Sequence, residues 1–156
     1  MRDIDDVTAL RDCLGQALAV SDWLEVTQER IAQFAEATGD MQWIHLDEKR
    51  ARIESPFGTT IAHGFLILSL ISTLFRGAVS FRGIRMSVNY GLNRVRFVSP
   101  VPSGTRIRGR FSPAAVDDLS GSVQVTWQVT IEREGASRPS CVAEWVVRYH
   151  PQPPGA

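Results

Sequence analysis

The sequence predicts an α+β domain in which an antiparallel sheet packs against one long apolar helix. Helical spacing of apolar residues dominates the first half of the chain, whereas alternation of apolar and polar residues dominates the second half. A length of 156 residues suits a single domain with a substantial core. We therefore expect one domain over residues 1–150 and a loose Pro/Gly-rich tail over 151–156.

Two helices and a strand are expected in the first part of the chain. Apolar residues from Ile4 onward recur with the spacing of a short amphipathic helix that ends near Leu14. Residues 22–26 can form a strand. Thr27 then suits the N-cap of a second helix, and Gly39 suits the left-handed residue that ends it.

A connection over residues 40–46 leads into the most apolar part of the chain. Asp47 is expected to cap a short helix that Pro56 stops. The next helix, over residues 63–79, has apolar side chains around almost its whole circumference, so we expect it to be buried inside the domain. These side chains are Phe65, Leu66, Ile67, Leu68, Leu70, Ile71, Leu74 and Phe75.

Regular alternation predicts four long antiparallel strands after the central helix. Residues 123–131 are apolar at every odd position, and residues 105–111 place three arginines on one face. Residues 93–97 and 141–149 complete the pattern. An antiparallel sheet has free edges, and long free edges invite pairing with another chain. Dimerisation through a sheet edge is therefore expected.

The composition is that of an ordinary globular protein, with 44% hydrophobic and 22% charged residues. The acidic start, residues 1–6, lacks the basic and apolar pattern of a secretory signal. The longest apolar stretch is broken by serines and is too short to span a bilayer. We therefore expect a cytoplasmic protein that does not associate with membranes. Cys13 and Cys141 lack metal or redox spacing and are expected to be free thiols.

Charge is distributed unevenly along the chain, although the net charge is zero. Residues 1–54 hold twelve acidic against six basic residues, and residues 76–110 hold eight arginines and no acid. These arginines could meet an anionic ligand, such as the phosphates of coenzyme A. We favour the alternative that they line the solvent face of strands and pair in part with the acidic first third. A zero net charge argues against nucleic acid as a partner.

Asp40 and His45 are the first candidate catalytic residues. A carboxylate and an imidazole five positions apart on a tight loop could hold one water molecule and exchange protons with it and with a carbon atom. On spacing alone, a turn aspartate after Gly39 and an ordinary buried histidine are the commoner interpretation. Either residue could serve as the acid or as the base.

His63 and Gly64 open the central helix. A ligand oxygen can approach the N–H of Gly64 closely, and a helix N-terminus favours negative charge developing there. Simple helix initiation is the alternative. Ser72 and Ser69 could contact a substrate, or they could bond to a carbonyl one turn back. Asp40, His45, Asp47 and His63 match no known metal-ligand spacing, so no metal site is expected, although the fold could gather these residues.

Two motifs resemble the signature of the MaoC-like, R-specific enoyl-CoA hydratases. The first has an aromatic residue, a small residue before Gly-Asp, and an aliphatic residue before His; the second opens the central helix of that family. A turn near residue 100 matches more weakly, and the first motif is most similar to the nodulation protein N subgroup. The matching residues are Phe34, Thr38, Gly39, Asp40, Ile44, His45 and Ala51 in the first motif, and Phe57 and 61–66 in the second.

The resemblance implies the hot dog fold, in which an antiparallel sheet wraps a long central helix, and it implies a homodimer. It further implies that Asp40 and His45 are the catalytic pair and that Gln42 carries the amide found between them in the family. The backbone N–H of Gly64 would bind the thioester oxygen. Ser72 matches a substrate-site serine of the family.

The activity implied by the resemblance is reversible hydration of trans-2-enoyl thioesters to R-3-hydroxyacyl thioesters. The acyl group would be carried on coenzyme A or acyl carrier protein, with no other cofactor. Two alternatives are a hot dog acyl-CoA thioesterase and a non-catalytic acyl-thioester-binding module; the presence of both Asp40 and His45 counts against the second. Gln42 and Trp43 stand where the family usually has Asn-Pro, so we expect a differently shaped loop and an altered acyl pocket.

Overall fold

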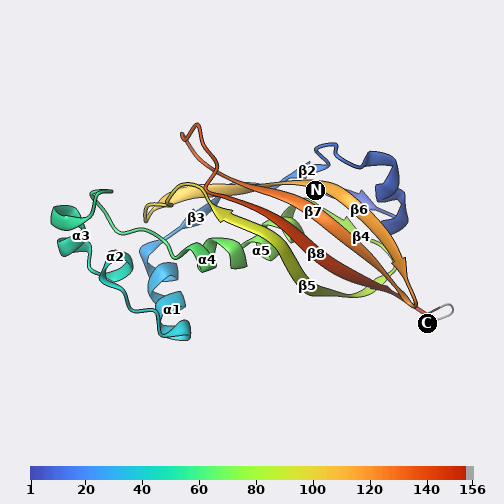
Figure 1. Cartoon of the computed structure of the whole chain (residues 1–156), viewed down its shortest axis with the longest axis horizontal. Coiled ribbons are helices and arrows are strands. Elements are labelled where there is room, and N and C mark those ends of the chain that lie inside the picture. The colour runs from blue at the N-terminus through green and yellow to red at the C-terminus, as the bar shows by residue number, and fades with distance from the viewer. Residues whose placement is uncertain (154–156) are drawn as a thin grey trace.

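The computed structural model describes residues 1–153, and Figure 1 shows how their helices and strands are arranged. Helices dominate the first half of the chain and long strands the second half, as the sequence predicts. The elements are β1 (Arg2–Ile4), η1 (Val7–Cys13), β2 (Ala19–Val20), β3 (Leu24–Val26), α1 (Gln28–Thr38), α2 (Trp43–Leu46), α3 (Glu48–Glu54), α4 (Gly64–Ser69), α5 (Ile71–Ala78), β4 (Val79–Phe81), β5 (Ile84–Phe97), β6 (Thr105–Leu119), β7 (Ser122–Arg133) and β8 (Cys141–Pro151).

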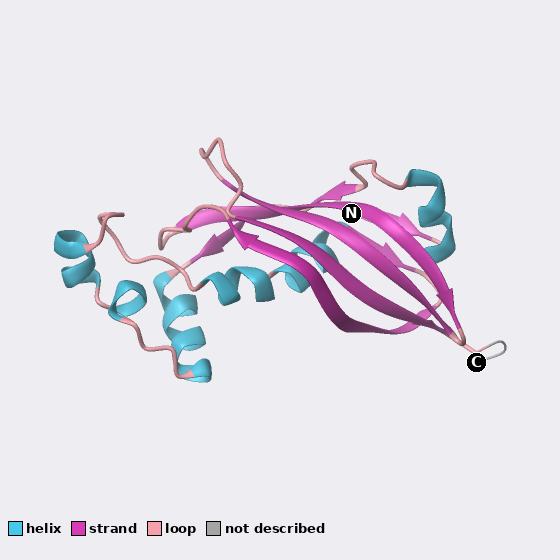
Figure 2. Cartoon of the chain, viewed as in Figure 1, coloured by secondary structure: helices cyan, strands magenta, loops and turns pink. Residues whose placement is uncertain are grey.

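The main sheet is antiparallel and has the strand order β2-β6-β7-β8-β5, with β3 also pairing with β6. Helices α4 and α5 lie along one face of this sheet, and α1 to α3 gather beyond one end of it (Figure 2). A parallel pair of β1 and β4 forms a second, two-stranded sheet. A sheet wrapped on a central helix is the hot dog fold, so the predicted α+β class is confirmed.

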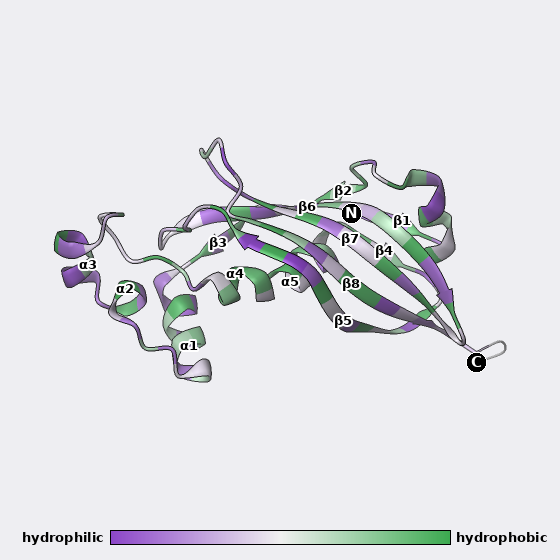
Figure 3. Ribbon diagram, in the orientation of Figure 1, coloured by the Kyte–Doolittle hydropathy of each residue, from purple (hydrophilic) through white to green (hydrophobic). Residues whose placement is uncertain are grey.

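The core lies between the sheet and the inner side of α4 and α5. The Phe75 ring packs edge-on against Phe111, Trp127 and Trp145, with centroid distances of 5.0, 4.8 and 5.3 Å. Trp127 is fully buried, and its Nε1–H donates to the hydroxyl of Tyr149 at 3.1 Å. The predicted alternation along β7 is confirmed, and Figure 3 shows hydrophobic positions recurring along β7 and β8.

The central helical segment is not buried on all sides, which corrects the prediction from its composition. It divides at Leu70 into α4 and α5, and one stripe of it remains open to solvent. Phe65 in that stripe is 67% exposed, and Ser69, Thr73 and Arg76 continue the stripe at steps of three or four residues. The sheet of a single chain therefore covers only one side of this helix.

The N-terminal helix begins later than predicted and is a 3₁₀ helix. Ile4 lies in β1 beside β4, and η1 starts only at Val7. The carboxylate of Asp6 accepts the N–H of Thr8 at 2.8 Å and its hydroxyl at 2.7 Å. This cap fixes the start of the helix and leaves the preceding residues extended.

Four of the eight arginines of residues 76–110 form ion pairs, and these four have two sets of partners. Arg82 pairs with Asp5 in the acidic first third, as predicted. The arginines of β6 instead pair with glutamates in β7 and directly after it, because the antiparallel register brings the two strands side by side. These pairs are Arg106 with Glu134, and Arg108 and Arg110 with Glu132.

Ordered structure extends past residue 151, where the sequence predicts the start of the loose tail. Strand β8 includes Pro151, and the N–H of Gln152 donates to the carbonyl of Gly83 at 2.8 Å. Residues 154–156 of the predicted tail lie outside the described residues. Cys13 and Cys141 are free thiols, as predicted. Within residues 1–153, every helix is too short or too polar to cross a membrane.

Candidate active site

The loop that carries Asp40 is set by the end of α1. Thr27 caps the start of this helix by accepting the N–H of Arg30 at 3.2 Å. Gly39 ends it with φ of 78°, and its N–H donates to the carbonyl of Ala35. Both caps are confirmed. Asp40 follows directly and its side chain is exposed to solvent, which a group that must meet a substrate requires.

His45 lies in α2, a single helical turn where the sequence predicts only a connection. The residue is buried, and its Nδ1 lies 2.7 Å from the carbonyl oxygen of Ile61. A carbonyl can only accept, so Nδ1 carries the proton and Nε2 keeps a free lone pair. Gln28 on α1 holds the main chain, because its Nε2 donates to the carbonyl of His45 at 2.7 Å.

The electrostatic environment keeps the His45 ring neutral. Burial lowers its pKa below the ordinary value of an imidazole, and the nearby His63 lowers it further. The hydrogen bond to Ile61 and the charge of Asp40 act in the opposite direction but do not reverse the shift. His45 therefore presents an unprotonated Nε2 at neutral pH, which is the state that a general base requires.

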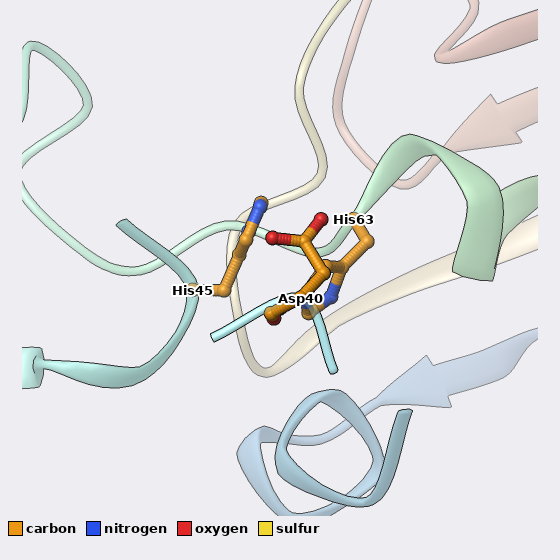
Figure 4. A group of neighbouring side chains, drawn as sticks. All are labelled: Asp40, His45 and His63. Carbon is orange, nitrogen blue, oxygen red and sulfur yellow. The ribbon is translucent and has the colours of Figure 1, made fainter. Parts of the chain in front are cut away.

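His63 brings Asp40 and His45 together. It is 2% exposed, and its ring stacks on the ring of His45 with centroids 3.7 Å apart and planes 27° apart. Its Nε2 lies 3.0 Å from the main-chain carbonyl oxygen of Asp40. Figure 4 shows the three side chains side by side, although they come from separate segments of the chain.

A metal could in principle use these three side chains, whose ligand atoms lie within 4.8 Å of one another. The geometry argues against it. The Nδ1 of His45 and the Nε2 of His63 already face carbonyl oxygens. We therefore keep the expectation that no metal binds here.

Gly64 is the first residue of α4, where a helical N–H has no intrahelical partner. A Cβ added to Gly64 would lie 2.9 Å from the ring of Phe97, so glycine is what permits this close packing. Gly64 and His45 line the same cavity of about 280 Å³, together with Phe97 and Ser140. The cavity is mostly apolar, as an acyl-binding site would be.

The structure places the other predicted site residues less centrally. Gln42 is exposed and its side chain makes no cap hydrogen bond, although its carbonyl accepts the N–H of His45 at 3.0 Å. The Trp43 ring packs under the guanidinium of Arg50 at 4.3 Å and does not line the cavity. Trp43 therefore does not contact the cavity directly, although the sequence predicts that it alters the acyl pocket.

Ser72 lies on α5, away from the cavity that His45 and Gly64 share. Its hydroxyl oxygen is 3.5 Å from the side-chain nitrogen of Asn89, and both residues line a separate cavity of about 590 Å³ with Phe75 and Trp145. The hydroxyl of Ser69 donates to the carbonyl of Phe65, one turn back, at 2.7 Å. This is the predicted alternative to a substrate contact. Ser72 remains a predicted substrate contact.

Two side chains at the site were not predicted from the sequence. The sequence places His63 at the helix start and in the second motif but does not predict its contacts to Asp40 and His45, because these depend on the folded arrangement. Ser140 is 2% exposed, and its hydroxyl has no hydrogen-bond partner among the described residues. A single serine before a strand carries no signal that would have identified it.

One family model and several curated proteins match most of this chain. The family model described as MaoC like domain matches residues 10–134. A protein of Mycobacterium tuberculosis named 3-hydroxyacyl-thioester dehydratase Z is 48% identical over 150 residues, which cover 96% of this chain and 99% of that protein. Nodulation protein N of Rhizobium leguminosarum bv. viciae is 49% identical over 135 residues, with coverage of 85% and 84%.

Solved structures share the fold at lower sequence identity. The MaoC-like dehydratase from Rhodospirillum rubrum has a TM-score of 0.71 and 21% identity, covering 92% of this chain and 97% of that one. The (R)-hydratase from A. caviae, described as involved in PHA biosynthesis, has a TM-score of 0.69 and 23% identity, with coverage of 84% and 93%.

Proposed function

The chain belongs to the MaoC-like domain family, and on that premise we propose that it is an R-specific enoyl-CoA hydratase. It would catalyse the reversible hydration of trans-2-enoyl thioesters to R-3-hydroxyacyl thioesters, which makes it a hydro-lyase. The observation that carries the proposal concerns His45, whose Nε2 is left unprotonated by the contact of Nδ1 with Ile61. A ring nitrogen of His45 lies within 4.8 Å of a carboxylate oxygen of Asp40, and His45 lines a cavity together with Gly64. A relative that matches over nearly its full length is named as a dehydratase, which supports the same reaction class.

The geometry supports a specific division of roles. The Nε2 of His45 would take a proton from water as the water oxygen bonds to carbon 3 of the enoyl group. The electrons of the double bond would move toward the thioester oxygen, where the N–H of Gly64 stabilises the developing enolate. The imidazolium, stabilised by the Asp40 carboxylate, would then return its proton to carbon 2. The OH of the water molecule is then on carbon 3 and its proton is on carbon 2, so the step requires no cofactor.

The substrate would be an acyl thioester carried on coenzyme A or acyl carrier protein. Purified protein mixed with enoyl-CoA substrates of graded length should remove the enoyl absorbance and form R-3-hydroxyacyl-CoA. A thioesterase would instead release free thiol, which a thiol reagent detects. A binding module would bind acyl-CoA without turnover. Either of these last two outcomes overturns the proposal.

We also propose that the protein is a homodimer joined through β5. This fourteen-residue strand pairs with β8 on one side and with no strand of residues 1–153 on the other. Tyr90 and Leu92 on it are 58% and 43% exposed, and the open stripe of α4 that begins at Phe65 is likewise uncovered. A long, partly apolar strand edge is a template for pairing, and a two-fold axis would join two such edges.

A further inference from the structure

His63 contacts two aromatic rings and, at the edge of its own ring, a main-chain carbonyl. One face stacks on His45, at a centroid distance of 3.7 Å. The ring of Phe34 on α1 lies at 5.1 Å, tilted by 52°. The Nε2 at the edge donates to the main-chain carbonyl of Asp40 at 3.0 Å. A single buried ring therefore contacts both members of the proposed catalytic pair.

The loop at Asp40 has few other attachments. Asp40 follows the left-handed Gly39, and its own N–H has only a long contact of 3.5 Å, to the hydroxyl of Thr38. The hydrogen bond from His63 links this loop to the start of α4, twenty-three residues further along the chain. Gly64, which directly follows His63, supplies the N–H that we propose as the donor to the thioester oxygen. His63 therefore contacts Asp40 and His45 and is bonded to Gly64.

The chemistry of the buried ring also needs an explanation. The Nδ1 of His63 has no hydrogen-bond partner among the described residues, and leaving a buried polar atom unpaired is unfavourable. An apolar ring would fill the same space without that cost. A phenylalanine, however, has no N–H to donate to the carbonyl of Asp40. The donated hydrogen bond is therefore the property that distinguishes histidine at this position.

We propose that His63 is a positioning residue, which fixes the Asp40 loop through its Nε2–H and the His45 ring through its face. It sets the spacing of the catalytic pair relative to the N–H of Gly64 without itself contacting the reacting atoms. The inference rests on the proposed function for its catalytic consequence. Its structural content, the tautomer and contacts of His63, can be measured without a substrate.

Two substitutions separate the two contacts. His63→Phe keeps the stacking ring and removes the donor, whereas His63→Gln keeps an N–H donor and removes the stacking face. The same two substitutions at His150, which lies in β8 beside Met86, serve as matched controls. For each variant we would measure kcat, KM, the pH dependence of kcat, and the melting temperature.

Both His63 variants should lower kcat by about ten- to a hundredfold, with KM little changed, because the misplaced groups act only in the transition state. His63→Gln should also move the acidic limb of the kcat profile to higher pH, since water then reaches the His45 ring. His63→Phe should leave that limb in place. Folded variants with wild-type kcat and wild-type pH profile would overturn the proposal, as would a lowered melting temperature with unchanged kcat.

A measurement on the wild-type protein covers the case in which a variant does not fold. Nitrogen chemical shifts of the histidine rings should give the Nε2–H tautomer for His63 and the Nδ1–H tautomer for His45. The opposite tautomer at His63 overturns the proposal, because Nε2 could not then donate to Asp40. Absence of hydration by the wild-type protein, with these tautomers present, would instead contradict the proposed function and leave the positioning contacts established.

Discussion

The ring Nδ1 of His45 donates to the carbonyl of Ile61 at 2.7 Å, which leaves Nε2 as the basic atom. Burial lowers the pKa of this ring, so it stays neutral at pH values where a free imidazole is already half protonated. We expect hydration activity to persist as the pH falls through about 6.5 and to decline only below it. A pH profile of kcat checks this; an acidic limb above 6.5 would contradict it.

The same shift predicts a dependence of stability on pH. Because the folded protein disfavours the charged form of His45, the unfolded chain binds more protons once the pH drops below about 6.5. The contribution of His45 to the free energy of unfolding should be complete above that pH. It should be lost as the pH falls through the lowered pKa. Urea unfolding at several pH values measures this loss, and His45→Gln should reduce it.

Replacing Gly64 with alanine should damage the proposed oxyanion site. The new Cβ would lie 2.9 Å from the Phe97 ring, so either the ring or the start of α4 must move. We expect kcat/KM to fall by about tenfold or more, since the N–H must meet the developing charge accurately. Gly77→Ala is the matched control, because that glycine lies in α5 with no atom near the added Cβ.

Gly77→Ala should leave kcat/KM unchanged and raise the free energy of unfolding by about 0.5–1 kcal/mol, because alanine loses less backbone freedom in a helix. Equal activity in both glycine variants would mean that the close packing of Gly64 does not serve the reaction.

The local features of this protein and its α+β class are predictable from the sequence, whereas individual contacts between distant segments are not. The caps at Thr27 and Gly39 depend on residues within four positions, so a single segment predicts them. The hydrogen bond from His63 to Asp40 depends on how α1 and α4 meet, which no local pattern encodes. The sequence does not predict the exposure of Phe65, because apolar composition does not indicate how much of a helix one sheet covers.

Two buried serines should respond oppositely to replacement by alanine. The hydroxyl of Ser21 accepts the N–H of Gly109 at 2.9 Å and donates to the carbonyl of Asp22 at 2.8 Å. Ser21→Ala should therefore lower the free energy of unfolding by about 1–2 kcal/mol. Ser140 has no partner for its hydroxyl among residues 1–153, so Ser140→Ala should be neutral or stabilising by up to about 1 kcal/mol. Chemical denaturation measures both, and a costly Ser140→Ala would reveal an unrecognised partner.

A charge placed on the free edge of β5 should separate the proposed dimer. Leu92→Lys puts two like charges near a two-fold axis, where both would lose water. Light scattering after size exclusion should give a dimer for the wild-type protein and a monomer for this variant. Leu119→Lys, at the end of β6, is the control and should remain dimeric. A monomeric wild-type protein at micromolar concentration would contradict the proposal.

The most direct test of the central claim is the rate of crotonyl-CoA hydration by Asp40→Asn, compared with the wild-type protein and with Glu36→Gln. Asn keeps the shape of the side chain but removes the charge that would stabilise the imidazolium of His45. Glu36 is exposed on α1 and makes no ion pair within the described residues, so its variant controls for the loss of one charge. We predict that kcat falls by about 10²–10⁴-fold in Asp40→Asn, with an unchanged melting temperature and a normal rate for Glu36→Gln. Full hydration activity in a folded Asp40→Asn protein would contradict the proposed mechanism.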